Sequence, residues 1–164
     1  MAVWGAGPAG TLLARAARAL GAAAVNVDPD PARHEAGGGR ERCPDGEFDV
    51  CVVAVGTRAA YAEAIDRLGP RGRLVVFSGL PPVGDRLEVG LNELHYREQT
   101  LVGAYGCAYR HGVAALNLIA AGAVPVADLV SHRLPLGRLA EALERVEARR
   151  CMKILLYPEV RGVR

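Results

Sequence analysis

Short apolar runs and stretches with helical spacing alternate along the chain. Four of the runs have the length of strands: residues 2–4, 22–27, 48–56 and 74–77. The third of these runs is almost continuously apolar, as is typical of a parallel strand that is covered on both faces. A helical pattern from Thr11 to Leu20 separates the first two runs, and a second from Arg58 to Leu68 separates the last two. The alternation predicts a three-layer α/β sandwich with a mostly parallel sheet.

The second half of the chain continues this alternation with shorter pieces. Alternating apolar and charged residues from Arg86 to Val89 predict an exposed edge strand. Further strands are expected at 101–105, 129–134 and 152–157, and further helices at 113–121 and 136–149. Only residues 29–47 separate the second and third runs, where a helix, a strand and a connection normally need about 30 residues or more. We therefore expect the third strand of the sheet to be missing or vestigial, within a single domain over residues 1–164.

The loop between the first apolar run and its helix reads Gly5-Ala6-Gly7-Pro8-Ala9-Gly10, a GxGxxG pattern. Gly5 allows a tight turn, Gly7 lets a pyrophosphate approach the backbone, and Gly10 lets the helix pack closely on the strand. Free N–H groups and the dipole at the start of the helix favour bound phosphate. Asp28 ends the second run, close to the spacing of about 20 residues at which a carboxylate accepts from ribose hydroxyls. Together these features predict a dinucleotide site, with a structural glycine turn and a helix cap at Asp28 as the alternatives.

Composition narrows the partners that this chain is expected to have. Hydrophobic residues make up 51% and charged residues 23%, with a formal charge of +2, which fits neither disorder nor a dedicated polyanion binder. Basic residues are separated by acids or glycines and aromatic residues are few, so we expect no nucleic-acid partner. No apolar run reaches the roughly 18 to 20 residues of a membrane span, so no membrane partner is expected either.

The cysteines and histidines show no pattern typical of metal ligands. The four cysteines lack CxxC spacing and no signal peptide precedes them, so we expect reduced thiols and a cytoplasmic protein. The four histidines are scattered, without the i,i+4 spacing of helical zinc ligands. No metal site is therefore expected.

The order and spacing of the segments resemble the cofactor-binding half of the medium-chain dehydrogenase/reductase family, the group of zinc alcohol, sorbitol and threonine dehydrogenases. The matching segments are Gly5 to Gly10, Asp28 with Arg33, Phe48 to Gly56, Gly72 to Val76, Glu98 to Gly103, Leu118 to Gly122, His132 to Leu136, Ala140 to Glu147 and Lys153 to Leu156. The resemblance implies a Rossmann-type fold and NAD as cofactor. Family members also carry a catalytic domain with a Cys, a His and a Glu around zinc, which this sequence lacks. A substrate pocket is therefore expected to come from a second copy or from a separate partner chain.

The resemblance also assigns cofactor contacts outside the glycine-rich loop. It places Asp28 at the adenosine ribose, which favours NAD because a carboxylate repels the 2′-phosphate of NADP. Arg33 matches a position near the adenine and weakens that preference. The residues that match loops along the pyrophosphate and nicotinamide are Gly56, Thr57, Ser78, Gly79 and Leu80. His111 and Tyr105, near the end of a strand that points toward the nicotinamide, are the candidate acid–base groups.

Three classes of function fit these expectations. The first is an NAD-dependent oxidoreductase of the medium-chain type, reduced to its cofactor-binding domain and independent of zinc. The second is a non-catalytic or regulatory module that binds NAD or dimerises. The third is a Rossmann fold reused for a non-redox reaction, since a fold does not determine a function. The sequence does not name the substrate.

We expect two copies of the chain to form a homodimer through the segment from Arg86 to Leu91. In the resembling family this segment joins two sheets across a twofold axis, and an edge strand with unpaired backbone groups invites antiparallel pairing. Leu87 and Val89 are expected to face one side and Glu88 the other. The alternative is a short edge protected from association by its charged residues.

Overall fold

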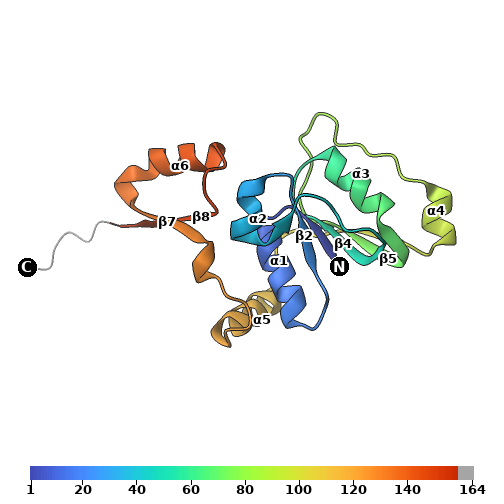
Figure 1. Ribbon diagram of the computed structural model, residues 1–164, viewed down its shortest axis with the longest axis horizontal. Coiled ribbons are helices and arrows are strands. Elements are labelled where there is room, and N and C mark those ends of the chain that lie inside the picture. Colours follow the sequence, from blue (N-terminus) through green and yellow to red (C-terminus); the bar gives the residue numbers. More distant parts are fainter. Residues whose placement is uncertain (159–164) are drawn as a thin grey trace, which may run out of the picture. The chain divides into compact units, whose positions relative to one another are not determined.

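The computed structural model describes residues 1–158, apart from the side chains of residues 35 and 36 (Figure 1). These residues form two compact units, Met1–Val124 and the part of the chain from Pro125 onward. Six strands of the first unit form one sheet in the order β3-β2-β1-β4-β5-β6, and every pairing in it is parallel. This is the strand order of a doubly wound Rossmann fold. The predicted α/β class with a mostly parallel sheet is confirmed.

The elements of the first unit alternate along the chain as predicted. Its strands are β1 (Ala2–Trp4), β2 (Val25–Val27), β3 (Gly39–Arg40), β4 (Phe48–Val53), β5 (Leu68–Val76) and β6 (Thr100–Gly103). Its helices are α1 (Pro8–Ala19), α2 (Pro31–Gly37), α3 (Arg58–Asp66), α4 (Leu91–Tyr96) and α5 (Tyr109–Ala120). The expected third strand is vestigial, because β3 has only two residues and pairs with β2.

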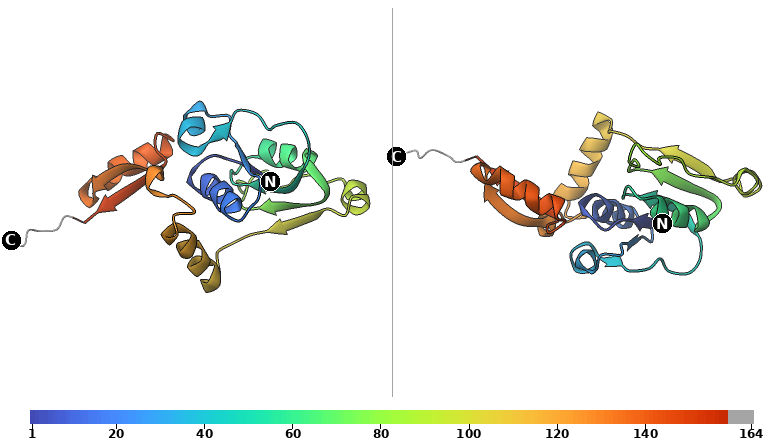
Figure 2. Two further views of the ribbon diagram at one scale, coloured as in Figure 1. Left: turned by 60° about the horizontal axis from the view of Figure 1, so that its bottom comes forward. Right: turned by 90° about the horizontal axis from the view of Figure 1, so that it is seen from above.

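Helices flank the sheet (Figure 2). Two apolar cores hold the helices to it. Successive strand residues point to opposite faces. Trp4 of β1 lies in a core with Ala64 of α3, whereas Val3 lies in a second core with Ala14 of α1. The helices α1 and α3 therefore cover opposite faces of the sheet.

The expected edge strand over Arg86 to Val89 is wrong for the single chain. Residues 85–90 have no regular secondary structure, and the sheet ends at β6. The segment finds no partner strand among the described residues, and a strand needs a partner for its backbone groups. Its side chains keep the expected alternation, since Leu87 and Val89 are half-buried and Glu88 is exposed. The short helix α4, which the apolar pattern did not predict, follows directly.

The second unit has a two-stranded parallel sheet and one longer helix. Its elements are the 3₁₀ turns η1 (Ala127–Leu129) and η2 (Leu136–Arg138), the strands β7 (Val130–Pro135) and β8 (Lys153–Tyr157), and the helix α6 (Leu139–Glu147). Glu141 of α6 pairs with both Arg138 and Arg145. No helix of the described residues is long and apolar enough to cross a membrane.

Truncation of Leu68 tests the position of the larger core. This side chain is 1% exposed, so Leu68→Ala leaves a cavity and should lower the free energy of unfolding by about 2 to 5 kcal/mol. Leu116→Ala is the control, because Leu116 of α5 is 66% exposed and its truncation should change stability by no more than about 0.5 kcal/mol. Urea unfolding followed by the fluorescence of Trp4, the single tryptophan, measures both. Equal losses in the two variants would contradict the structure.

Candidate cofactor site at the glycine-rich loop

The glycine-rich loop turns the chain from the end of β1 into α1 at the carboxyl edge of the sheet. Gly5 has φ +106°, a backbone conformation that side-chain-bearing residues rarely adopt, and its N–H donates to Val27 O at 2.7 Å. Gly7 is the N-cap of α1, and Pro8 opens the first turn, where its missing N–H costs no hydrogen bond. The loop therefore stays attached to β2 while the start of α1 points out of the sheet edge.

Gly10 and Gly7 have opposite steric surroundings. A Cβ on Gly10 would lie 1.9 Å from the carbonyl oxygen of Gly5, so only glycine permits this packing of α1 on the loop. A Cβ on Gly7 would meet nothing within 4 Å. The space in front of Gly7 is therefore open, which suits the close approach of a ligand to the backbone.

The first turn of α1 has the features of an anion site. No side chain caps it, and it contains no acidic residue that would repel a phosphate. The first N–H groups of a helix lack partners within the helix, and its dipole favours negative charge at this end. These features and the open space at Gly7 fit a pyrophosphate at the loop.

Asp28 lies beside this loop at the end of β2. Its Oδ2 accepts from the N–H of Ala6 at 2.8 Å, and its Oδ1 accepts from the N–H of Asp30 at 3.0 Å. Each carboxylate oxygen has a second lone pair, so the half-buried group can also accept from a ligand. Asp30, rather than Asp28, is the N-cap of α2 and accepts from the N–H of Ala32.

Two basic side chains of α2 are already engaged with this turn. The Nε atom of Arg33 lies 4.0 Å from Oδ2 of Asp30, and the Arg33 side chain is 14% exposed. Nε2 of His34 lies 2.7 Å from the carbonyl oxygen of Asp28. Asp28 and Arg33, the residues expected at the ribose and near the adenine, therefore lie at the same turn of the chain.

The loops after β4 and β5 meet at the same edge of the sheet. A Cβ on Gly56 would lie 2.7 Å from the carbonyl oxygen of Gly79, so these two loops touch. The hydroxyl of Tyr61 donates to the carbonyl oxygen of Ser78, and burial raises the pKa of this phenol. Thr57 caps α3 by accepting from the N–H of Ala60. The carboxyl end of β4 adjoins the glycine-rich loop, because the N–H of Ala54 donates to Trp4 O at 2.8 Å.

The candidate acid–base residues lie on an exposed stretch after β6. Tyr105 is fully exposed, and His111 lies exposed in the first turn of α5. Neither side chain forms a hydrogen bond or an ion pair with another residue among residues 1–158. Within the same residues no three His, Cys, Asp or Glu side chains gather closely enough to hold a metal ion.

Two buried polar residues under the loop escaped the sequence analysis. Asn26 of β2 and Thr11 of α1 both donate to backbone carbonyls of the loop, Asn26 to Gly5 and Gly10 and Thr11 to Ala6. The available signal for Asn26 was a polar residue inside the apolar run 22–27.

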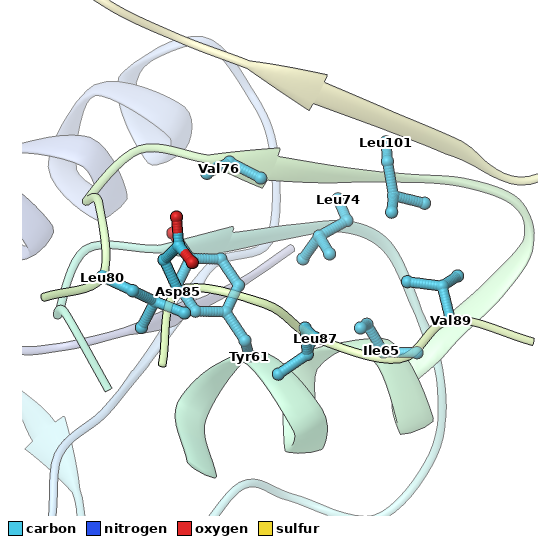
Figure 3. Close-up of a pocket in the computed structure, with 9 residues that line it drawn as sticks. All are labelled: Tyr61, Ile65, Leu74, Val76, Leu80, Asp85, Leu87, Val89 and Leu101. Atoms are coloured by element: carbon cyan, nitrogen blue, oxygen red, sulfur yellow. The ribbon is translucent and has the colours of Figure 1, made fainter. Parts of the chain in front are cut away.

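An apolar cavity of about 170 Å³ lies on the α3 side of the sheet, between β5, β6 and the segment that follows β5 (Figure 3). The residues that line it are Tyr61, Ile65, Leu74, Val76, Leu80, Asp85, Leu87, Val89 and Leu101. Leu80 is the one expected cofactor contact among them. None of the lining residues belongs to the glycine-rich loop, so this cavity is separate from that loop.

Comparisons with known proteins point to one group. No family model matches the chain. L-galactonate-5-dehydrogenase of Escherichia coli strain K12 is 30% identical over 160 residues, which cover 87% of this chain and 46% of that protein. L-threonine 3-dehydrogenase of Saccharopolyspora erythraea is 27% identical over 114 residues, which cover 70% of this chain and 32% of that protein. An alcohol dehydrogenase structure from Thermotoga maritima matches with a TM-score of 0.85 and 25% identity over 96% of this chain and 49% of that one.

The homologues of this chain are zinc-type medium-chain dehydrogenases. The resemblance to the medium-chain dehydrogenase/reductase family inferred from the motifs is thereby confirmed, as is the Rossmann-type fold. The chain spans between 32% and 49% of the length of the three relatives described above. What the comparisons establish is therefore the kinship of this chain with medium-chain dehydrogenases and its Rossmann-type fold.

The opposite surroundings of Gly7 and Gly10 lead to a test that needs no ligand. Gly10→Ala should lower the free energy of unfolding by about 3 kcal/mol or more, because the new Cβ overlaps the Gly5 carbonyl. Gly7→Ala should change it by less than about 1 kcal/mol, since its Cβ enters open space. Urea unfolding of both variants gives the comparison. A Gly10→Ala protein as stable as the wild type would refute the close packing of α1 on the loop.

Proposed function

We propose that this chain is the cofactor-binding part of a medium-chain oxidoreductase that uses NAD and that its own residues work without zinc. The observation that carries the proposal is the pairing of an uncapped α1 start, open at Gly7, with the Asp28 carboxylate on the adjoining Ala6 N–H. When bound, the nicotinamide ring supplies hydride transfer. The loop residues Gly5 to Gly10 would hold the pyrophosphate, and Asp28 would hold the ribose.

The surroundings of Asp28 support NAD rather than NADP. Its carboxylate is half-buried beside the loop, where a 2′-phosphate would meet a like charge. Arg33 lies against Asp30, so its charge is already partly compensated. The four free cysteines fit the reducing cytoplasm that we propose as its location.

The substrate side of the reaction would be completed by another chain or by a second copy of this one. His111 and Tyr105 are the acid–base groups that we propose on this side, and both are exposed for contact with such a partner. The same exposure, without a polar partner among the described residues, favours the second candidate, a regulatory or dimerising NAD-binding module. Turnover of an alcohol or carbonyl substrate would distinguish the oxidoreductase from the module.

Cofactor titration tests the proposal directly. NADH should quench the fluorescence of Trp4, which lies next to the loop, and Gly7→Val or Asp28→Ala should each raise the NADH dissociation constant about tenfold or more. NADPH should bind the wild type more weakly than NADH, and Asp28→Ala should narrow that difference. Asp66→Ala, at an exposed acid of α3, is the matched control and should bind like the wild type. The absence of saturable binding of either nucleotide would end the proposal.

We propose further that two copies pair through Arg86 to Leu91. The segment is extended, with Leu87 and Val89 turned into the apolar cavity and Arg86 and Glu88 exposed. Its backbone lacks a partner strand among the described residues, and a second copy in antiparallel orientation would supply one.

A proline in this segment tests the strand pairing. Val89→Pro removes a backbone donor, so the dimer should dissociate to monomers in light scattering at tens of micromolar. Val89→Ala keeps the donor and should remain dimeric, which separates backbone pairing from side-chain packing. A monomeric wild type, or a proline variant that stays dimeric, would show that this interface is wrong.

A further inference from the structure

The buried side-chain amide of Asn26 supports the glycine-rich loop. Asn26 is 0% exposed and lies in the middle of β2, where it pairs with Val3 of β1 and Gly39 of β3. Its Nδ2 donates to the carbonyl oxygen of Gly5 at 3.2 Å and to that of Gly10 at 2.9 Å. One side chain therefore ties the first glycine of the loop to the third.

The two acceptors determine which way the amide faces. Both neighbours of Nδ2 are carbonyl oxygens, so the NH₂ group must point at them and Oδ1 must point away. Oδ1 is then buried, with no hydrogen-bond partner among the described residues. An unsatisfied acceptor destabilises a core, and the neighbouring β2 positions Val25 and Val27 avoid it by being apolar. The amide therefore supplies a donor to two loop carbonyls while its own oxygen stays without a partner.

The effect on the loop follows from the geometry of one peptide bond. The peptide between Gly5 and Ala6 is planar and trans, so its C=O and N–H point in opposite directions. Asn26 binds the C=O, and the Oδ2 of Asp28 accepts from the N–H at 2.8 Å. Asn26 of β2 and Asp28, which directly follows that strand, thus hold this peptide from both sides.

We propose that Asn26 is a positioning residue that, together with Asp28, clamps the Gly5–Ala6 peptide. The clamp sets the orientation of the loop backbone and anchors the carboxylate of Asp28. Its consequence for nucleotide affinity rests on the proposed function, whereas its consequence for the order of the loop does not.

Asn26→Val tests the clamp by separating stability from binding. The variant leaves the Gly5 and Gly10 carbonyls without this donor but also removes the orphaned Oδ1, so the two effects oppose each other and the melting temperature should fall by no more than about 5 °C. Its NADH dissociation constant should nevertheless rise about tenfold or more. A purely structural residue would lower the melting temperature and leave the NADH affinity of the folded protein within twofold of the wild type. Asn117→Val, the same change at an exposed position of α5, should alter neither.

Amide hydrogen exchange gives a second measurement that needs no nucleotide. The Ala6 amide should exchange about tenfold faster in Asn26→Val, because its peptide loses one of its two supports, while the amides of β4 should exchange as in the wild type. If Asn26→Val does not fold, Asn26→Ser takes its place, because its short hydroxyl cannot reach both carbonyls.

The two measurements separate failure of the clamp from failure of the proposed function. If the wild type binds no nicotinamide nucleotide, the proposed function fails and the exchange rate alone decides on the clamp. Faster exchange at Ala6 supports the clamp in that case, and unchanged exchange overturns it. If the wild type binds NADH and the variant binds it within twofold of the wild type, the clamp has no part in binding and the inference is wrong.

Discussion

The close approach of α1 to the end of β1 is the constraint on which the rest of the site depends. The Gly10 backbone comes so near to the Gly5 carbonyl that a single Cβ would lie 1.9 Å from it. This approach directs the start of α1 at the sheet edge, with an uncapped first turn. It also brings two carbonyl oxygens toward the same buried space, where they need a donor. The amide of Asn26 is that donor.

The shortened connection between β2 and β4 has a related consequence on the other side of the loop. A Cβ on Gly37, the last residue of α2, would lie 2.3 Å from the Ala6 carbonyl oxygen. The hydroxyl of Thr11 donates to that same oxygen at 3.1 Å. With β3 reduced to two residues, the end of α2 packs directly on the loop. The glycine-rich loop therefore packs against β2, the end of α2 and Thr11 of α1, and the space in front of Gly7 is open.

The β6 edge of the sheet, in contrast to the enclosed glycine-rich loop, is open. Leu101 and Val102 of β6 point to opposite faces and are each 39% exposed. No described element pairs with β6 on its outer side. This outer edge of the sheet is therefore open among the described residues.

Periodicity and glycine spacing were enough to predict the class of fold, the place of the glycine-rich loop between β1 and α1, the position of Asp28 directly after β2, and the vestigial third strand. These features are local, because strand length, helix caps and turn glycines depend on neighbouring residues. The edge strand at Arg86 to Val89 was wrong because alternation reports which side chains face the protein, while a strand also requires a partner for its backbone. Alternation without pairing produces the extended, irregular segment that the structure contains.

The sequence alone thus determined the family, the sheet and the position of the glycine-rich turn. The tertiary structure decided which atoms support that turn. Asn26, Asp28 and Thr11 reach the loop from different elements, and a hydrogen bond between distant residues leaves no spacing that could be recognised along the chain. The orphaned oxygen of Asn26 is the plainest case, because burial and the geometry of two carbonyls, neither of which is a property of β2 by itself, decide the direction of the amide.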